Sequence, residues 1–134
     1  MAKTARRAGA EGLCVALVQE GLLLREFDVD GPILVLSEQP VDDLPAAVAA
    51  RLTSTVYSEA QIDALVAAGA ADHPVHLKID TGMHRVGCRP EDAVDLARRI
   101  AAAAPALRFE GVFTHLAVAD VPDDPYTDLQ LDRF

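Results

Sequence analysis

Residues 75–88 read Val75-His76-Leu77-Lys78-Ile79-Asp80-Thr81-Gly82-Met83-His84-Arg85-Val86-Gly87-Cys88. The first five of them form a short apolar run with one lysine in it, which is typical of a buried strand. The run breaks at Asp80 into a polar loop that contains glycine. In α/β enzymes such loops carry functional residues, because the strand before them holds them in position. The stretch therefore predicts a parallel α/β sheet with a functional site at the end of this strand.

Lys78 is the unusual residue of the run. A cation in an apolar strand is costly unless it is paired or loses its charge. Asp80 is the only acidic residue of the stretch, and Arg85 adds a second positive charge a few residues later. Two interpretations follow. Either the lysine stem is buried and the amine reaches the strand end, or Lys78 belongs to a site.

Apolar runs alternate with helical segments along the rest of the chain. Strands are expected at residues 13–18, 33–36, 53–57, 75–79 and 107–113, and helices at residues 2–8, 19–27, 43–52, 58–69, 90–104 and 127–134. The residues expected to face the core from these helices are Leu22, Leu23, Leu24, Ile62, Leu65, Val66, Val94, Leu96, Ala97 and Ile100. This alternation is typical of βα units with right-handed crossovers. It does not distinguish part of a barrel from an open, doubly wound sheet.

Length and composition exclude several classes. The 134 residues are too few for a complete (β/α)8 barrel, which needs about 250. The net charge of −9 argues against nucleic acid as a partner, because phosphates require a basic surface. Cys14 and Cys88 lack the spacing of a disulfide framework or zinc ribbon, and no apolar run approaches the length of a membrane span. We therefore expect a soluble, cytoplasmic protein with no membrane partner.

Two segments resemble the alanine racemase family. Residues 78–87 resemble its Lys-x-Asp-Thr-Gly-Met-x-Arg-x-Gly signature, and residues 111–120, Gly-Val-Phe-Thr-His-Leu-Ala-Val-Ala-Asp, resemble a second family segment. They occur in the family's order and spacing, and the resemblance covers nearly the whole chain. It implies an α/β fold that is a partial (β/α)8 TIM barrel of about five parallel strands alternating with helices. Residues 1–134 would match the middle of the N-terminal barrel domain, without its first strand, its last strands and the C-terminal β-domain.

The resemblance also implies a function and site residues. Members of the family interconvert L-alanine and D-alanine with pyridoxal 5'-phosphate for peptidoglycan synthesis, and the parent protein is expected to be a cytoplasmic homodimer. Arg85 matches the arginine that donates a hydrogen bond to the phenolic oxygen of the cofactor, and His115 matches a histidine beside the cofactor ring. Lys78 matches a lysine that is carbamylated in several members, and a carbamate would hold Arg85 by charge-assisted hydrogen bonds. Asp80 and Met83 are expected to shape the loop.

No catalytic residue is assigned in this chain. The lysine that binds the cofactor and the catalytic tyrosine of the resembling family have no counterpart here, so the chain alone is expected not to racemise alanine. Lys78, Arg85 and His115 are expected on one rim, with Lys78 pointing inward. The four histidines and Cys88 show no compact metal-ligand spacing, so no metal site is expected. The alternatives are another pyridoxal phosphate-dependent barrel enzyme, such as a serine racemase or an amino-acid decarboxylase, and a non-catalytic protein that binds this cofactor.

Overall fold

The computed structural model describes the whole chain, residues 1–134. Its strands are β1 (Leu13–Val15), β2 (Ile33–Val35), β3 (Thr53–Val56), β4 (His73–Lys78) and β5 (Leu107–Phe113). Its α-helices are α1 (Ala2–Arg7), α2 (Val18–Glu26), α3 (Leu44–Ala49), α4 (Glu59–Ala67), α5 (Ala93–Ala102) and α6 (Tyr126–Asp132). Short 3₁₀ turns, η1 (Val41–Asp43) and η2 (Pro90–Asp92), lead into α3 and α5. Every expected element is present, although β1 is shorter than expected because Val18 already begins α2.

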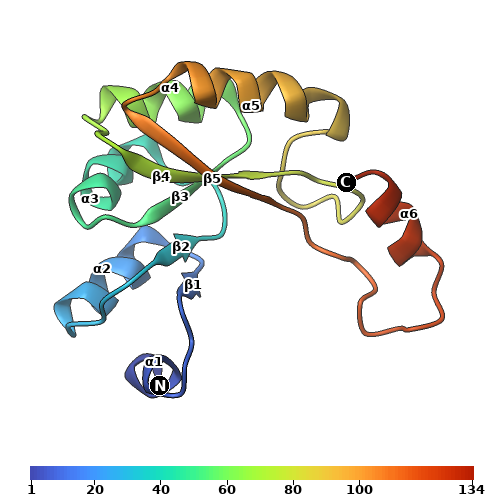
Figure 1. Cartoon of the computed structure of the whole chain (residues 1–134), viewed down its shortest axis with the longest axis horizontal. Helices are drawn as coiled ribbons and strands as arrows, with labels where there is room; N and C mark the ends of the chain where they lie inside the picture. The colour runs from blue at the N-terminus through green and yellow to red at the C-terminus, as the bar shows by residue number, and fades with distance from the viewer.

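The strands form one parallel sheet in the order β1-β2-β3-β4-β5. Spatial order therefore equals chain order, and Figure 1 shows the strands following one another across the molecule. A doubly wound open sheet reverses its strand order at a switch point, whereas successive βα units of a barrel keep it. The sheet is thus an arc of barrel type, and the predicted five parallel strands are confirmed.

The core lies between the sheet and the helices on one face of it. Val75, Leu77 and Ile79 of the β4 segment pack in one apolar cluster with residues of α4 and α5, such as Leu65 and Ile100. A second, smaller cluster joins β2 to α2 and α3. In Figure 1 these helices lie along the same side of the strands. This one-sided cover is what a barrel arc requires, because its other face lines the barrel interior.

Three residues expected in the core are exposed instead. Leu23 is 51% exposed, Val66 42% and Val94 58%. Each stands in or beside a run of consecutive apolar residues, and a helix with 3.6 residues per turn cannot turn all of such a run to one side. In α2 the buried side is made by Val18 and Gly21. A Cβ at Gly21 would lie 2.7 Å from Cδ1 of the buried Leu52, so the glycine allows α2 to approach the core closely.

The opposite face of the sheet carries a different set of side chains. Because side chains alternate along a strand, the register of β3, β4 and β5 puts Thr55 beside His76, and Lys78 beside Phe113, on the face away from the helices. β1 and β5 each have one unpaired edge. None of the helices is both long and apolar enough to span a membrane.

Candidate functional site

The candidate site lies where β4 and β5 end. Lys78 is the last residue of β4, Arg85 lies in the loop that follows it, and His115 comes shortly after β5. Because the two strands are parallel neighbours, their carboxyl ends lie on the same rim of the arc. That rim carries the functional residues in barrel enzymes.

The Lys78 side chain is buried on the face away from the helices, since only 4% of the residue is exposed. Its Nζ lies 4.7 Å from the centroid of the Phe113 ring, within the range of a cation–π contact. His76 meets the same ring edge-on, with ring centroids 6.3 Å apart. Phe113 is therefore flanked by His76 and Lys78, and no carboxylate forms an ion pair with the amine.

Burial lowers the pKa of the Lys78 amine, and the positive charge of Arg85 lowers it further, while the charge of Asp80 acts in the opposite direction. A lowered pKa increases the neutral fraction of the amine, which is the nucleophilic form. Lys78 is thus a chemically unusual lysine on geometric grounds and on electrostatic grounds.

Asp80 organises the loop rather than neutralising Lys78. Its Oδ1 accepts hydrogen bonds from the backbone N–H groups of Gly82 and His84, each at 3.0 Å. Burial raises the pKa of the carboxyl, but the backbone donors of His84, Gly82 and Met83 and the charge of His84 together outweigh it, and the pKa lies below its ordinary value. The carboxylate therefore fixes the turn that begins the loop.

The far end of the loop is fixed to the end of β4. The N–H of Asp80 donates to the carbonyl of Cys88 at 2.8 Å, and the N–H of Cys88 donates to the carbonyl of Lys78 at 3.0 Å. Gly87 makes this return possible: its φ is +129°, and a Cβ there would lie 2.6 Å from the Asp80 nitrogen. Residues 80–88 are therefore pinned at both ends, while Arg85 lies on the free middle part.

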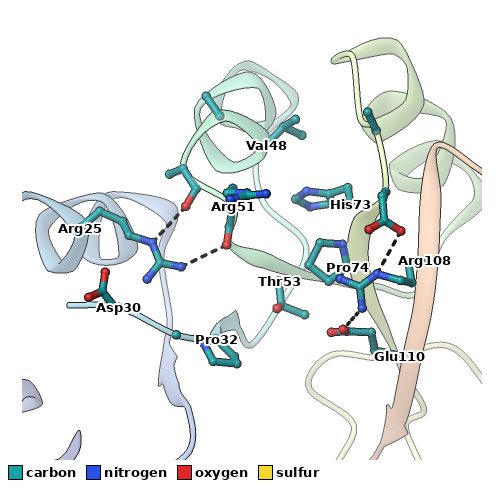
Figure 2. Close-up of a pocket in the computed structure, with 15 residues that line it drawn as sticks. Arg25, Asp30, Pro32, Val48, Arg51, Thr53, His73, Pro74, Arg108 and Glu110 are labelled. Carbon is teal, nitrogen blue, oxygen red and sulfur yellow. Dashed lines mark hydrogen bonds and ion pairs between the residues drawn. The ribbon is translucent and has the colours of Figure 1, made fainter. Parts of the chain in front are cut away.

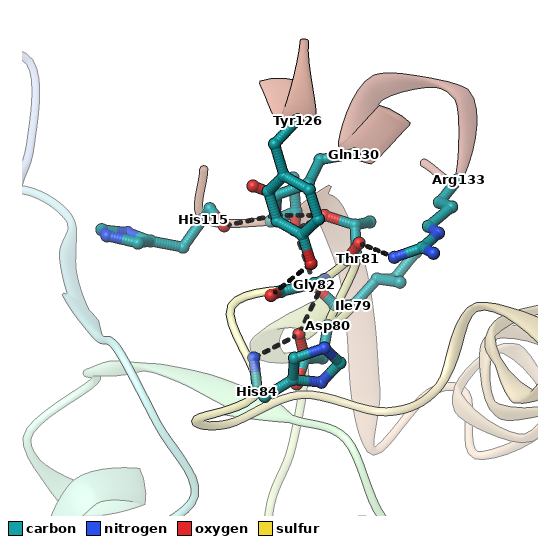
Figure 3. Close-up of polar contacts among 10 residues, drawn as sticks. Ile79, Asp80, Thr81, Gly82, His84, His115, Tyr126, Gln130 and Arg133 are labelled. Atoms are coloured by element: carbon teal, nitrogen blue, oxygen red, sulfur yellow. Dashed lines mark hydrogen bonds and ion pairs between the residues drawn. The ribbon is translucent and has the colours of Figure 1, made fainter. Parts of the chain in front are cut away.

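Arg85 and His115 are both exposed, and Met83 is half-buried. Arg85 takes part in none of the ion pairs of the chain. The His115 ring points away from the polar contacts between α6 and the β4 loop (Figure 3). The rim thus presents a guanidinium and an imidazole that form no ion pair, and the planar, permanently charged guanidinium is suited to an anionic ligand.

Sequence reasoning missed a buried polar network behind this rim. Gln130 of α6 hydrogen-bonds Thr81 in the β4 loop, and Thr81 hydrogen-bonds Thr114 after β5. Tyr126 and Arg133 reach the same loop through the carbonyls of Gly82 and Thr81, at 3.0 and 3.1 Å. One signal was available: polar residues at positions 126, 130 and 133 have the spacing that lines one face of a helix.

A hollow of about 720 Å³ lies at the other end of the strands, lined by Arg25, Arg51, His73 and Arg108 among others (Figure 2). Two of its arginines, Arg25 and Arg108, already form hydrogen bonds or ion pairs within the chain. Arg25 donates to the carbonyls of Ala50 and Arg51 at 3.0 and 3.1 Å, and Arg108 pairs with Asp72 and Glu110. These bonds tie chain turns together at the amino ends of the strands, the face that stabilises barrels rather than carrying their chemistry.

No group of His, Cys, Asp or Glu side chains comes together in a way that would hold a metal ion. His73, one of the candidate ligands, is buried with its Nε2 at 2.9 Å from Ser54 Oγ. Burial and the charge of Arg108 lower the pKa of this histidine. His73 is therefore a core residue whose surroundings favour the neutral imidazole.

Comparisons with known proteins agree with the fold. The profile of the family described as "Alanine racemase, N-terminal domain" matches residues 1–134. Alanine racemases from Levilactobacillus brevis and Latilactobacillus sakei subsp. sakei are 39% and 41% identical over 100% of this chain and 37% of each protein. The chain thus spans little more than a third of the length of these relatives.

Solved structures give the same result. The alanine racemase of E. faecalis superposes with a TM-score of 0.90 at 37% identity, over 99% of this chain and 37% of that one. A histidine racemase from Leuconostoc mesenteroides subsp. sake superposes with a TM-score of 0.88 at 29% identity, over 98% of this chain and 36% of that one.

Proposed function

Because this chain belongs to the alanine racemase N-terminal domain family, we propose that it is part of an enzyme that interconverts L-alanine and D-alanine with pyridoxal 5'-phosphate. The observation that carries the proposal is the rim at the ends of β4 and β5, where a buried lysine, a free arginine and a free histidine lie on the family motif residues. The chain covers little more than a third of its relatives, so the activity is proposed for the protein that contains it.

The rim residues fit this cofactor. Arg85 is exposed and unpaired, so its planar, permanently charged donors are free to bind the phenolic oxygen of the cofactor. His115 is exposed beside the same rim and would lie against the cofactor ring. When bound, pyridoxal phosphate supplies an electron sink that makes the Cα proton of an amino acid acidic.

Lys78 is proposed to be carbamylated. The nitrogen of its neutral amine adds to the carbon of CO₂: a C–N bond forms, one C=O π bond breaks and leaves its electron pair on oxygen, and one amine proton leaves to solvent. The product is an anion in place of a cation. It would face Arg85, whose charge now lowers the pKa of the amine, and would accept charge-assisted hydrogen bonds from the guanidinium. The modification therefore converts an unfavourable pair of like charges into a favourable pair.

Racemisation requires that a proton leave one face of Cα and return to the other. We assign neither base to residues 1–134. The role of this chain is to position the cofactor through Arg85 and His115 and to hold that arginine through Lys78. We propose further that the whole protein is a cytoplasmic homodimer that supplies D-alanine for peptidoglycan.

The test uses the full-length protein that contains this chain. Purified protein with pyridoxal phosphate should convert L-alanine to D-alanine, measured by chiral chromatography, and Arg85→Ala should lower kcat at least about tenfold, a loss of roughly 1.4 kcal/mol of transition-state stabilisation. Arg98→Ala is the matched control, because Arg98 is an exposed arginine of α5 that pairs only with Asp95. Residues 1–134 alone should give no turnover. Absence of D-alanine from the full-length protein would contradict the proposal.

A second candidate is a racemase for another amino acid, favoured by the similarity to the histidine racemase. L-alanine, L-serine and L-histidine should therefore be compared in the same assay. Formation of D-histidine or D-serine without D-alanine would replace the proposed substrate. Release of an amine and CO₂ would instead indicate a decarboxylase.

A further inference from the structure

Gln130 is a fully buried polar side chain at the junction of three segments. It is 0% exposed, and a buried amide is costly unless its polar atoms are hydrogen-bonded. Its Oε1 accepts from the backbone N–H of Ala117 at 2.7 Å. Its Nε2 donates to Thr81 Oγ1 at 3.0 Å and to the carbonyl of His115 at 3.1 Å. Figure 3 shows the side chain between the β4 loop and the segment after β5.

The orientation of this amide is determined by its partners. A backbone N–H can only donate and a carbonyl can only accept, so Oε1 must face Ala117 and Nε2 must face His115. The hydroxyls beyond it are ordered as well. Thr114 Oγ1 donates to the carbonyl of Ile79 at 2.8 Å, so it must accept from Thr81 Oγ1, which lies 2.8 Å away. Thr81 Oγ1 in turn accepts from Gln130.

We propose that Gln130 is a positioning residue that couples the loop carrying Arg85 to the segment carrying His115. Its one amide group hydrogen-bonds Thr81, at the start of the loop that carries Arg85, and also hydrogen-bonds the backbone of His115 and Ala117 in the segment after β5. Its role for the cofactor rests on the proposed function, because that function gives Arg85 and His115 their tasks. The coupling of the two segments does not depend on it.

Neighbouring residues of α6 differ from Gln130 in one respect. The side chains of Tyr126 and Arg133 each bond only the β4 loop, through the carbonyls of Gly82 and Thr81. Tyr126 packs closely, since a Cβ at Gly82 would lie 2.5 Å from its hydroxyl oxygen. Tyr126→Phe is therefore a matched control that removes one bond from α6 to the first loop and leaves the second segment untouched.

The first experiment measures hydrogen exchange by mass spectrometry on the cofactor-free, full-length protein. Gln130→Leu should accelerate exchange about tenfold in peptides covering residues 80–86 and in peptides covering residues 115–119, because a buried network loses its donor to both. Tyr126→Phe should accelerate exchange in residues 80–86 alone. If Gln130→Leu loosens one of the two segments but not the other, the coupling is wrong.

The second experiment uses Gln130→Glu, which keeps the shape of the side chain. A carboxylate would place an acceptor against the His115 carbonyl, which is also an acceptor. It would also remove the hydrogen bond that Gln130 donates to Thr81 Oγ1. Protonation of the new carboxyl restores one donor. The measured quantity is the ratio of the dissociation constant of pyridoxal phosphate for the variant to that for the wild type at the same pH. This ratio should be about ten at pH 8 and should fall toward one at pH 6. For Gln130→Leu the ratio should stay constant.

Several titratable groups lie on the elements packed around Gln130: Tyr126 and Arg133 from α6 and its end, Asp80 and His84 in the β4 loop, and His115 after β5. They are present in variant and wild type alike, so the ratio at each pH removes their contribution. A ratio for Gln130→Glu that does not change with pH would overturn the positioning role.

The two experiments separate the two proposals. If the wild-type full-length protein does not bind pyridoxal phosphate, the proposed function fails, and the exchange data still decide whether Gln130 couples the segments. If Gln130→Leu does not fold, exchange in Gln130→Glu takes its place: both segments should be protected more at pH 6 than at pH 8 after correction for the intrinsic pH dependence of exchange. Equal corrected protection at both values would refute the coupling.

Discussion

At the scale of single residues, Lys78 carries the clearest electrostatic conflict in the chain. Its amine is buried against Phe113, faces the charge of Arg85, and has no ion-pair partner. Its pKa is lowered in the folded state, first by burial and then by Arg85. Between the folded and unfolded pKa values the unfolded chain binds more protons, so the free energy of unfolding rises with pH in this window. At neutral pH, charged Lys78 is therefore a source of instability.

Replacing Lys78 by methionine should remove this cost while keeping the apolar stem. In CO₂-free buffer, Lys78→Met should be more stable than the wild type at pH 7, and the difference should shrink as the pH approaches the ordinary value of a lysine, about 10.4. Denaturant unfolding at several pH values measures it. Added bicarbonate should stabilise the wild type and leave Lys78→Met unchanged, because only the wild type can form a carbamate. If the difference in the free energy of unfolding between Lys78→Met and the wild type changes neither with pH nor with bicarbonate, this account of Lys78 is wrong.

At the scale of elements, the glycines with positive φ are of two kinds. Some have a backbone atom so close that a Cβ would clash with it, and others have open space and are needed only for their φ. Gly69 ends α4 with a φ of +83° and open space around its Cα, whereas Gly87 has a φ of +129° and the Asp80 nitrogen 2.6 Å from where a Cβ would stand. Gly69→Ala should cost about 1 kcal/mol, the strain of a left-handed residue.

Gly87→Ala adds a clash with backbone to the same strain. It should therefore cost more than Gly69→Ala, about 3 kcal/mol, and should loosen the loop that carries Arg85. Urea unfolding of the full-length protein compares the two costs, and hydrogen exchange reports on residues 80–88. Equal costs for the two substitutions would show that the loop can shift to accept a Cβ.

The elements also show where sequence reasoning succeeds and where it stops. The end of β5 at Phe113 was predicted, and the end of β4 was predicted one residue beyond Lys78, because apolar runs and turn residues mark both places locally. The buried faces of α2, α4 and α5 were predicted less well: Leu23, Val66 and Val94 face solvent because helical geometry divides an apolar run between two sides. The contact of Gln130 with Thr81 spans 49 residues, and no local pattern encodes a hydrogen bond at such a separation.

At the scale of the whole molecule, the barrel-type arc is open. The strand order predicts that a closed barrel would continue from both β1 and β5, each of which has an unpaired edge. Ile33 and Val35 of β2 pack against α2 and α3, so the alternation of side chains leaves Leu34, which is half-buried, on the face away from the helices. Unpaired edges and exposed apolar faces both promote association.

Residues 1–134, expressed alone, should therefore self-associate despite the net charge of −9. Sedimentation velocity at increasing protein concentration should show species larger than the monomer. Leu34→Asp should shift the distribution toward monomer, because it places a charge on the open face beside Cys14 of β1. Val94→Asp is the matched control, since Val94 is also apolar and is 58% exposed, but it lies on α5, which covers the other face. If the chain sediments as a monomer at all concentrations, or if the two substitutions act equally, the open face and edges do not drive association.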